Sequence, residues 1–360
     1  MVNIGISGPK SGSVCVCVII FIVHMNYSEL TSIENLFQAW DEFKKGKRKR
    51  KDVQVFERNL EDNLFNLHFQ LKKKIYQHGK YQTFYVYDPK KRHIHKASVE
   101  DRIIHHLLYK YLYNLFNKSF IFDSYSCRLD KGTHKAIKRL EKFTRIVSKN
   151  YTKPCWALKL DIKKFFASID HDILIGLLEK KIKDKDILWL FTQVIHSFQT
   201  ASQALLGEAK GIPLGNLTSQ IFANIYLNEL DQFVKHGLKI KYYLRYADDF
   251  LILSCYNKSL SRLTVTLGRF LEKNLNLELH PKKIILRKLE WGIDFLGYVI
   301  LPHYILPRTK TKKRIFNKLK TKINSPNFDQ SLQSYLGYLS HINSYRLEQK
   351  LKNQIWFWQE

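Results

Sequence analysis

Two adjacent aspartates, Asp248 and Asp249, stand in the segment YYLRYADDFLIL, between runs of aromatic and aliphatic residues. These runs are typical of two strands joined by a tight turn. Aspartate is common in turns that face water, but tight hairpins favour a glycine after the aspartate and none follows here. Burying two carboxylates is costly unless a cation neutralises them. The pattern therefore indicates a metal-binding turn rather than ordinary loop chemistry.

A third carboxylate, Asp161, ends the apolar segment WALKL just where the chain is expected to turn. Magnesium usually takes one or two carboxylates, with water and substrate phosphates as its other ligands. Two such ions clamp the attacking and leaving oxygens of an in-line phosphoryl transfer. We expect Asp161 and Asp248 as the primary ligands and Asp249 as an auxiliary one. Asp170 and Asp172 lie beyond the turn and are expected to support the loop or to cap the next helix.

The elements that must position these carboxylates follow from hydrophobic periodicity. Near the aspartates we expect a strand, a turn and a helix over 156–174, a glycine-rich loop opening a helix over 210–234, and a helix near 258–276. Upstream, the spacing predicts a helix over 53–71, a strand, a turn and an extended segment over 81–95, and a helix over 99–116. Short strands over 279–300 and helices after residue 307 complete the chain.

The net charge of +28 indicates an anionic partner. Nucleic acid is the commonest one, through neutralisation of phosphates and release of counterions. The basic run KKGKRKRK, with Lys47, Arg48, Lys49 and Arg50, is expected to contact phosphate rather than to be a plain solvated loop. A membrane partner is not expected, because the apolar run over 14–23 is too short to span a bilayer.

Cysteine and histidine usage does not favour a zinc or disulfide framework. The five cysteines are scattered, odd in number and form no CxxC pair. Four histidines between residues 93 and 106 lack a consistent ligand spacing, so packing and surface roles are expected for them. A reducing, cytoplasmic setting fits best.

The ordered motifs resemble those of reverse transcriptases. YADD looks like the catalytic signature of that family, and LKLDIKKFFASIDHDIL resembles the acidic motif that precedes it in the palm. DPKKR and EDR look like fingers segments, SYSCRLDKGTHKAI like the next block, and LNLELHPKK and IDFLGYVI like late palm motifs. SYLGYLSHINS is similar to a thumb helix. The resemblance covers roughly residues 80–345.

The resemblance implies roles for single residues. Asp161, the Ile162 carbonyl, Asp248 and Asp249 would hold two magnesium ions, with manganese as a substitute. The remaining nucleotide-contacting positions that the motifs imply are Lys90 and Arg92 on the triphosphate, Phe166 against a ribose 2′-hydroxyl, and Leu214, Gly215 and Gln220 in the loop beside the incoming nucleotide. Lys91 could replace its neighbours, and Phe165 is expected to be a core residue.

The loop LGNLTSQ departs from the commonest pattern. Group II intron and retron enzymes mostly carry glutamine before the loop glycine and end the loop in Ser-Pro, whereas this chain has Leu214 there and ends in Ser219-Gln220. The pattern resembles reverse transcriptases of diversity-generating retroelements. Loss of an amide beside the nascent base pair predicts reduced fidelity. That family makes adenine-mutagenic cDNA from a template-repeat RNA, for targeted diversification of a gene by mutagenic retrohoming.

The partners that this resemblance implies are template RNA, primer, cDNA, deoxynucleotides and an oligomeric small basic accessory variability protein. The gene would be bacterial, archaeal or phage-encoded. Two alternatives stay open. One is a group II intron-like, abortive-infection or CRISPR-associated reverse transcriptase, and the other is a non-catalytic RNA-binding scaffold.

The fold expected from the resemblance is α+β, a right-hand polymerase. A basic N-terminal region and fingers would occupy 25–155, a palm with an antiparallel sheet, helices and the YADD hairpin 156–304, and a helical thumb 305–360. Residues 1–24 would be an N-terminal extension, and the sequence leaves open whether they belong to the native protein.

Overall fold

The computed structural model of the chain describes residues 25–87, 91–198 and 209–359. The described chain divides into two compact units, each built from several segments. Unit 1 holds residues up to Ile121, then Lys164–Asp231 and Lys273–Leu277, and unit 2 holds the rest. The expected extension 1–24 and the turn at Asp88-Pro89 lie outside the described residues. The four linear domains inferred from the sequence stay a prediction.

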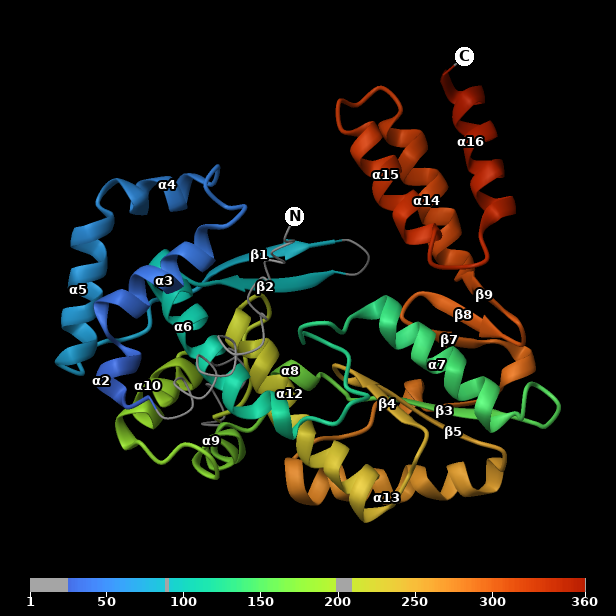
Figure 1. Cartoon of the computed structure of the whole chain (residues 1–360), viewed down its shortest axis with the longest axis horizontal. Coiled ribbons are helices and arrows are strands. Elements are labelled where there is room, and N and C mark those ends of the chain that lie inside the picture. Colours follow the sequence, from blue (N-terminus) through green and yellow to red (C-terminus); the bar gives the residue numbers. More distant parts are fainter. Residues whose placement is uncertain (1–24, 88–90, 199–208, 360) are drawn as a thin grey trace, which may run out of the picture. The chain divides into compact units, whose positions relative to one another are not determined.

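Unit 1 is mainly helical (Figure 1). Its first helices are α2 (Tyr27–Leu30), α3 (Ile33–Lys44), α4 (Lys51–Arg58), α5 (Leu60–Lys72) and α6 (Val99–Phe116). The segment 53–71 was predicted as one helix, but the backbone leaves helical geometry at Asn59, with φ −120° and ψ 46°. Two helices result, and Val53, Phe56, Leu64, Leu67 and Leu71 still face the core as their spacing requires.

A two-stranded hairpin joins α5 to α6 in unit 1. It pairs β1 (Gln82–Val86) with β2 (Arg92–Lys96) in antiparallel register, which confirms the two extended segments predicted around the Asp88-Pro89 turn. The further helices that the structure describes in this unit are α8 (Phe165–Ser168), α9 (His171–Glu179), α10 (Lys185–His196) and α12 (Leu217–Gln232). Asp170 accepts hydrogen bonds from the backbone N–H groups of Asp172 and Ile173, so the expected helix cap is confirmed.

Unit 2 contains a four-stranded antiparallel sheet in the order β4-β5-β3-β6. Its strands are β4 (Tyr243–Tyr246), β5 (Asp249–Ser254), β3 (Trp156–Asp161) and β6 (Ile285–Lys288). Helices α7 (Thr133–Val147) and α13 (Asn257–Leu275) lie on opposite sides of this sheet (Figure 1). Apolar side chains of α7, such as Ile137, Leu140 and Phe143, share one core with β3, β4 and β5.

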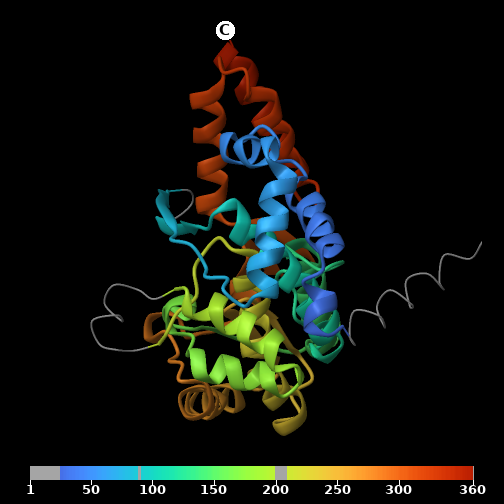
Figure 2. The same cartoon turned by 90° about the vertical axis from the view of Figure 1, so that its left-hand side faces the viewer.

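A second sheet and a helical bundle complete unit 2. The second sheet pairs β7 (Ile293–Phe295), β8 (Tyr298–Leu301) and β9 (Tyr304–Pro307) in antiparallel order, and its residues belong to the same core as α7. After it come α14 (Thr309–Lys322), α15 (Phe328–Leu339) and α16 (Tyr345–Gln359), which lie side by side in both views (Figures 1 and 2). These three helices bury a separate apolar cluster, which is the pattern expected of a helical bundle.

Two further facts bear on the membrane and disulfide expectations drawn from the sequence. Among the described residues, no helix is both long and apolar enough to cross a bilayer. The described cysteines, Cys127, Cys155 and Cys255, are all free thiols.

Candidate functional site

Three carboxylates gather where the central strands of unit 2 end. In the β3–β5 pair, Asp161 stands directly opposite Asp249. Asp161 is only 6% exposed, and Asp248 occupies the turn between β4 and β5. The antiparallel pairing of the strands thus brings Asp161 close to two aspartates that follow it in the chain by 87 and 88 positions. The strand end predicted at Asp161 and the hairpin predicted around the aspartate pair are both confirmed.

The turn itself has only two residues, Ala247 and Asp248, because Tyr246 pairs with Asp249. Ala247 has a left-handed backbone with φ +53°, where a hairpin would ordinarily place Gly or Asn. The left-handed region costs a residue with a Cβ about 1–2 kcal/mol. The surrounding structure must therefore hold this turn in place.

Arg245 supplies that support. It is fully buried, and its guanidinium donates to the Ala247 carbonyl and to Ser124 Oγ, both at 3.2 Å. Its backbone is also held on both sides, since its N–H donates to the Asp123 carbonyl and its carbonyl accepts from Tyr125 N–H, each at 2.9 Å. Arg245 is therefore a positioning residue that ties the turn to the segment before α7. Sequence reasoning missed it.

Burial and like charges raise the pKa values of the carboxyls in this site. The pKa of Asp248 is raised to about 6, first by burial and then by the negative charge of Asp161. The pKa of Asp249 is raised as well, chiefly by burial, and Asp161 adds to the shift. Two lysines oppose these effects: Lys283 lowers both pKa values and Lys159 lowers that of Asp249.

Lys283 and Lys159 are the counter-charges that the sequence reading did not identify. Lys283 Nζ lies 2.7 Å from Asp161 Oδ1, and Lys159 Nζ lies 3.7 Å from Asp249 Oδ1. Lys283 reaches Asp161 because His280 N–H donates to the Asp161 carbonyl at 2.8 Å and anchors the turn of Pro281–Lys283. The only sequence signal for this contact was the motif LNLELHPKK, which carried no assigned role.

The oxygen atoms of the three carboxylates are of the kind that binds a hard divalent cation, although the side chains do not point at one common position. In the described parts of the chain, no group of three or more His, Cys, Asp or Glu side chains is arranged to hold a metal ion. Carboxylate oxygens are nevertheless the ligands that magnesium prefers, and the negative charge of Asp161 adds to the burial that raises the pKa values of Asp248 and Asp249. Ile162 is buried and forms an isolated bridge with Leu279, and the ligand role of its carbonyl stays a prediction.

Within unit 1, the loop predicted to lie beside the nucleotide packs on the β1–β2 hairpin. The Leu214 carbonyl accepts from His95 N–H at 3.0 Å. Gly215 has φ +118°, and a Cβ there would lie 2.9 Å from Ile94 Cγ2. Both the conformation and the close approach therefore require glycine at this position.

Sequence-predicted residues from two distant segments line one pocket of about 360 Å³ in unit 1. Lys47 and Arg50 come from the basic run, and Gly215 and Gln220 from the loop. Burial and the charges of Arg102 and Arg50 lower the pKa of Lys47. In the described chain, Nδ2 of Asn216, another lining residue, is buried without a hydrogen-bond partner.

The other predicted residues are placed as follows. Phe165 is buried, as expected of a core residue, while the neighbouring Phe166 is only partly covered and its carbonyl accepts from Ile212 N–H at 2.7 Å. Arg92 is exposed at the start of β2, and Lys90 lies outside the described residues. Of the basic run, Arg48 pairs with Glu57 at 2.9 Å and Lys49 is exposed.

Comparison with protein families gives a match to the model described as "Reverse transcriptase (RNA-dependent DNA polymerase)" over residues 72–300. Two curated relatives are the putative COX1/OXI3 intron 2 protein of Saccharomyces cerevisiae and the group II intron-encoded protein LtrA of Lactococcus lactis. The first is 22% identical over 68% of this chain and 35% of its own length. The second is 29% identical over 47% of this chain and 29% of its own length. The chain thus spans about a third of these relatives.

A solved structure similar to the chain is that of apo telomerase from Candida tropicalis. The match covers 76% of this chain and 60% of the telomerase chain, at 14% sequence identity and a TM-score of 0.52. At that identity the likeness concerns the fold alone. Together with the antiparallel sheet and its flanking helices, it confirms the α+β right-hand polymerase architecture expected from the sequence.

Proposed function

The chain belongs to the reverse transcriptase (RNA-dependent DNA polymerase) family, and from this premise we propose that it copies RNA into DNA. The observation that carries the proposal is the cross-strand pair of Asp161 and Asp249 with Asp248 in the adjoining turn. Like charges placed opposite each other on neighbouring strands are destabilising, so the arrangement is hard to explain without a cationic ligand. A scaffold that only bound RNA would have no physical need for it.

The carboxylates would hold two magnesium ions, with Asp161 and Asp248 as primary ligands, Asp249 beside them and the Ile162 carbonyl as a further donor. Manganese is the expected substitute. When bound, such ions stabilise the attacking and leaving oxygens of an in-line phosphoryl transfer. The primer 3′-oxygen forms a bond to the α-phosphorus of a deoxynucleotide, and pyrophosphate leaves. Arg245 keeps the carboxylate turn in place.

The remaining predicted residues would bind and select the nucleotide. Lys90 and Arg92 would contact the triphosphate, and Phe166 would exclude a ribose 2′-hydroxyl. The pocket that joins Lys47 and Arg50 to Gly215 and Gln220 supports a nucleic-acid contact there, since it combines cations with the amide Nδ2 of Asn216, which has no hydrogen-bond partner among the described residues.

Within the family, we propose a diversity-generating retroelement enzyme, which copies a template-repeat RNA with errors at adenines and works with a small basic accessory variability protein. Leu214 supports this assignment because it removes the amide that intron-type enzymes carry there. We further propose a cytoplasmic location. The second candidate is a group II intron-like enzyme, which the similarity to the group II intron-encoded protein of Lactococcus lactis favours.

Primer extension on an RNA template, with sequencing of the products, tests both levels. We expect magnesium-dependent DNA synthesis that Asp248→Ala abolishes, with errors concentrated opposite template adenines. Synthesis with few and unbiased errors would support the polymerase activity but would assign the chain to the intron-like group. No synthesis, even with the cognate RNA and accessory protein supplied, would leave only the RNA-binding scaffold.

A further inference from the structure

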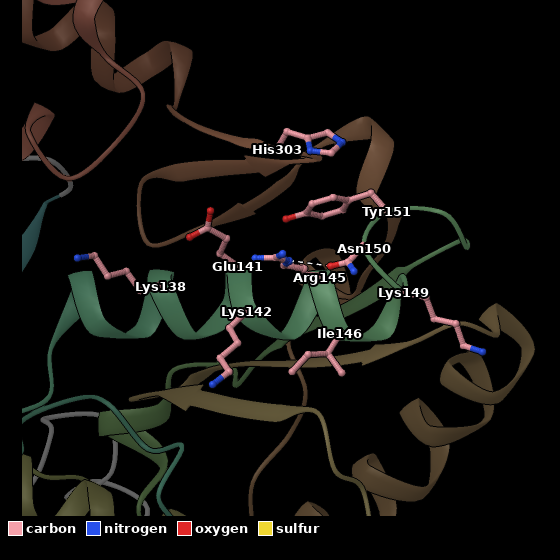
Figure 3. A pocket seen from close by; sticks show the side chains of 9 residues that line it. All are labelled: Lys138, Glu141, Lys142, Arg145, Ile146, Lys149, Asn150, Tyr151 and His303. Atoms are coloured by element: carbon pink, nitrogen blue, oxygen red, sulfur yellow. Dashed lines mark hydrogen bonds between the residues drawn. The ribbon is translucent and has the colours of Figure 1, made fainter.

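A basic pocket of about 960 Å³ lies in unit 2 along the exposed face of α7 (Figure 3). None of its lining residues belongs to the site described above. One side comes from α7 and the turn after it, and the other from His303, at the turn between β8 and β9.

Four cations form a row along α7 and the turn after it. Lys138, Lys142, Arg145 and Lys149 follow one another at intervals of four, three and four residues, and all are exposed. This spacing places Lys138, Lys142 and Arg145 on one face of α7, over about 10 Å at 1.5 Å per residue, and Lys149 follows in the turn after the helix ends at Val147. Cations held this close repel one another, and a polyanion would relieve that repulsion.

Little in the described part of the chain neutralises this row. Among the described residues, Lys138, Lys142 and Lys149 form no ion pair, and Arg145 donates to a neutral partner, Asn150 Oδ1, at 2.7 Å. Glu141 is the one acid among the described residues that line the pocket, and it stands on the side of α7 toward His303 (Figure 3).

The end of the row carries two aromatic rings on a backbone that is costly to form. Tyr151 and His303 have their ring centroids 4.5 Å apart at an interplanar angle of 59°. Lys149, Asn150, Tyr151 and His303 all adopt left-handed conformations, with φ between +49° and +69°. Hydrogen bonds hold this turn, among them one of 2.8 Å from Tyr151 N–H to Ser148 Oγ. Strained residues gathered at one pocket are characteristic of binding sites.

We propose that this pocket binds a single-stranded segment of RNA outside the polymerisation site. Its phosphates would lie along the row on α7, and an unpaired base would contact the Tyr151–His303 pair. Cations that follow a backbone, together with aromatic rings that accept bases of any sequence, are the two components of single-strand binding sites. The inference rests on the proposed RNA substrate of the chain but not on its catalytic activity.

The test measures binding of a fluorescein-labelled single-stranded RNA of mixed sequence by anisotropy, at several salt concentrations. The full chain is first saturated with unlabelled primer–template, so that the polymerisation site is filled. For Lys138→Glu/Lys142→Glu we expect binding at least tenfold weaker. The log–log slope of affinity against salt should decrease by about 0.7 for each phosphate that the variant no longer neutralises. Extension of a short primer–template should not change.

The matched control is Lys258→Glu/Arg262→Glu, an equal charge change at the same spacing on an exposed face of α13. It should alter binding by no more than about twofold, as expected for a charge outside the contact. Equal weakening by both variants, or no change in either, would overturn the proposal. If the double reversal does not fold by circular dichroism, Lys142→Gln/Lys149→Gln gives the same comparison of slopes.

The aromatic contact has its own variant. His303→Asn keeps a residue that tolerates the left-handed backbone while it removes the ring. Binding should weaken about fivefold or more with an unchanged salt slope, because stacking contributes no counterion release. Unchanged binding would refute the base contact. Each of these results can be read even if the chain shows no DNA synthesis, so the two proposals can fail separately.

Discussion

Asp161 and Asp249 occupy opposite positions of the antiparallel pair β3–β5, so two carboxylates face each other across neighbouring strands. Such like-charged pairs destabilise a sheet. Here the cost is increased by burial, which is the first cause of the raised pKa of Asp249. Lys283 and Lys159 offset only part of it, since the pKa stays raised despite them. The pair is therefore a local weakness of the fold that a bound cation would relieve.

The pH dependence of stability should reveal this weakness. The pKa of Asp248 rises from 3.8 to about 6 on folding, so between these values the folded chain binds more protons than the unfolded one. Stability contributed by the protonated carboxyl is present below pH 3.8 and is lost as the pH rises through about 6. In EDTA, Asp248→Asn should raise the free energy of unfolding by about 1–2 kcal/mol at neutral pH, with little gain in acid.

Urea unfolding at several pH values would measure this effect. Asp130→Asn is the control, because Asp130 is exposed and asparagine accepts its left-handed backbone. A loss of stability in Asp248→Asn at neutral pH would contradict the assigned cause of the shift.

Removing the positive charge of Lys283 should raise the pKa values of the neighbouring carboxyls further. Lys283 lowers the pKa values of Asp248 and Asp249, so Lys283→Gln raises both. We expect the acid limb of the pH–rate profile for primer extension to move to higher pH when magnesium is below saturation. Lys282→Gln, a change at the exposed neighbouring lysine, should leave the profile in place. Superimposable profiles for the wild type and Lys283→Gln would argue against the role of this lysine.

The support of the turn can be tested at Arg245. Replacing it with methionine leaves the Ala247 carbonyl and Ser124 Oγ without this donor. The loss should lower the free energy of unfolding by about 2–4 kcal/mol, because each unsatisfied buried group costs about 1–3 kcal/mol. The rate constant kcat should fall more than KM for the deoxynucleotide changes, with partial recovery in Arg245→Lys. A variant that is unstable but retains wild-type kcat at low temperature would make Arg245 purely structural.

Much of this site was predictable from local sequence. The end of β3 at Asp161, the β4–β5 hairpin and the cap at Asp170 depend on patterns within a few residues of each other. The contacts from Lys283 to Asp161 and from Arg245 to Ser124 join residues more than 120 positions apart, and no local pattern encodes them. The break at Asn59 was missed for a different reason: the apolar spacing continues through it, and it outweighed the local stop signal of a basic Arg58 followed by Asn59.

Selection against ribonucleotides should depend on one of two adjacent rings. Phe166→Ala should raise incorporation of ribonucleotides relative to deoxynucleotides by up to about 100-fold, the scale on which apolar pockets discriminate against an added hydroxyl. Phe165→Leu, a change at the buried neighbour, should instead lower stability by roughly 1 kcal/mol and leave sugar selection unchanged. Competition between the two nucleotide types in single-turnover extension provides the ratio. The reverse assignment would follow if only the Phe165 variant altered it.

Fidelity is the property that separates the two enzyme types, and Leu214 is the residue on which it should depend. Its carbonyl is held by His95 N–H and the next residue is a glycine that the close approach of Ile94 requires, so the backbone there is constrained and the side chain is the free variable. Leu214→Gln restores the amide of the intron-type enzymes. Because sites that hydrogen-bond their substrates discriminate more strongly than apolar ones, errors opposite template adenines should fall by roughly tenfold.

The control is Leu214→Met, which keeps an apolar side chain of similar size and should retain the wild-type error spectrum. Deep sequencing of cDNA from one RNA template provides the comparison, and equal error rates in all three proteins would remove the structural basis for assigning the chain to a mutagenic retroelement.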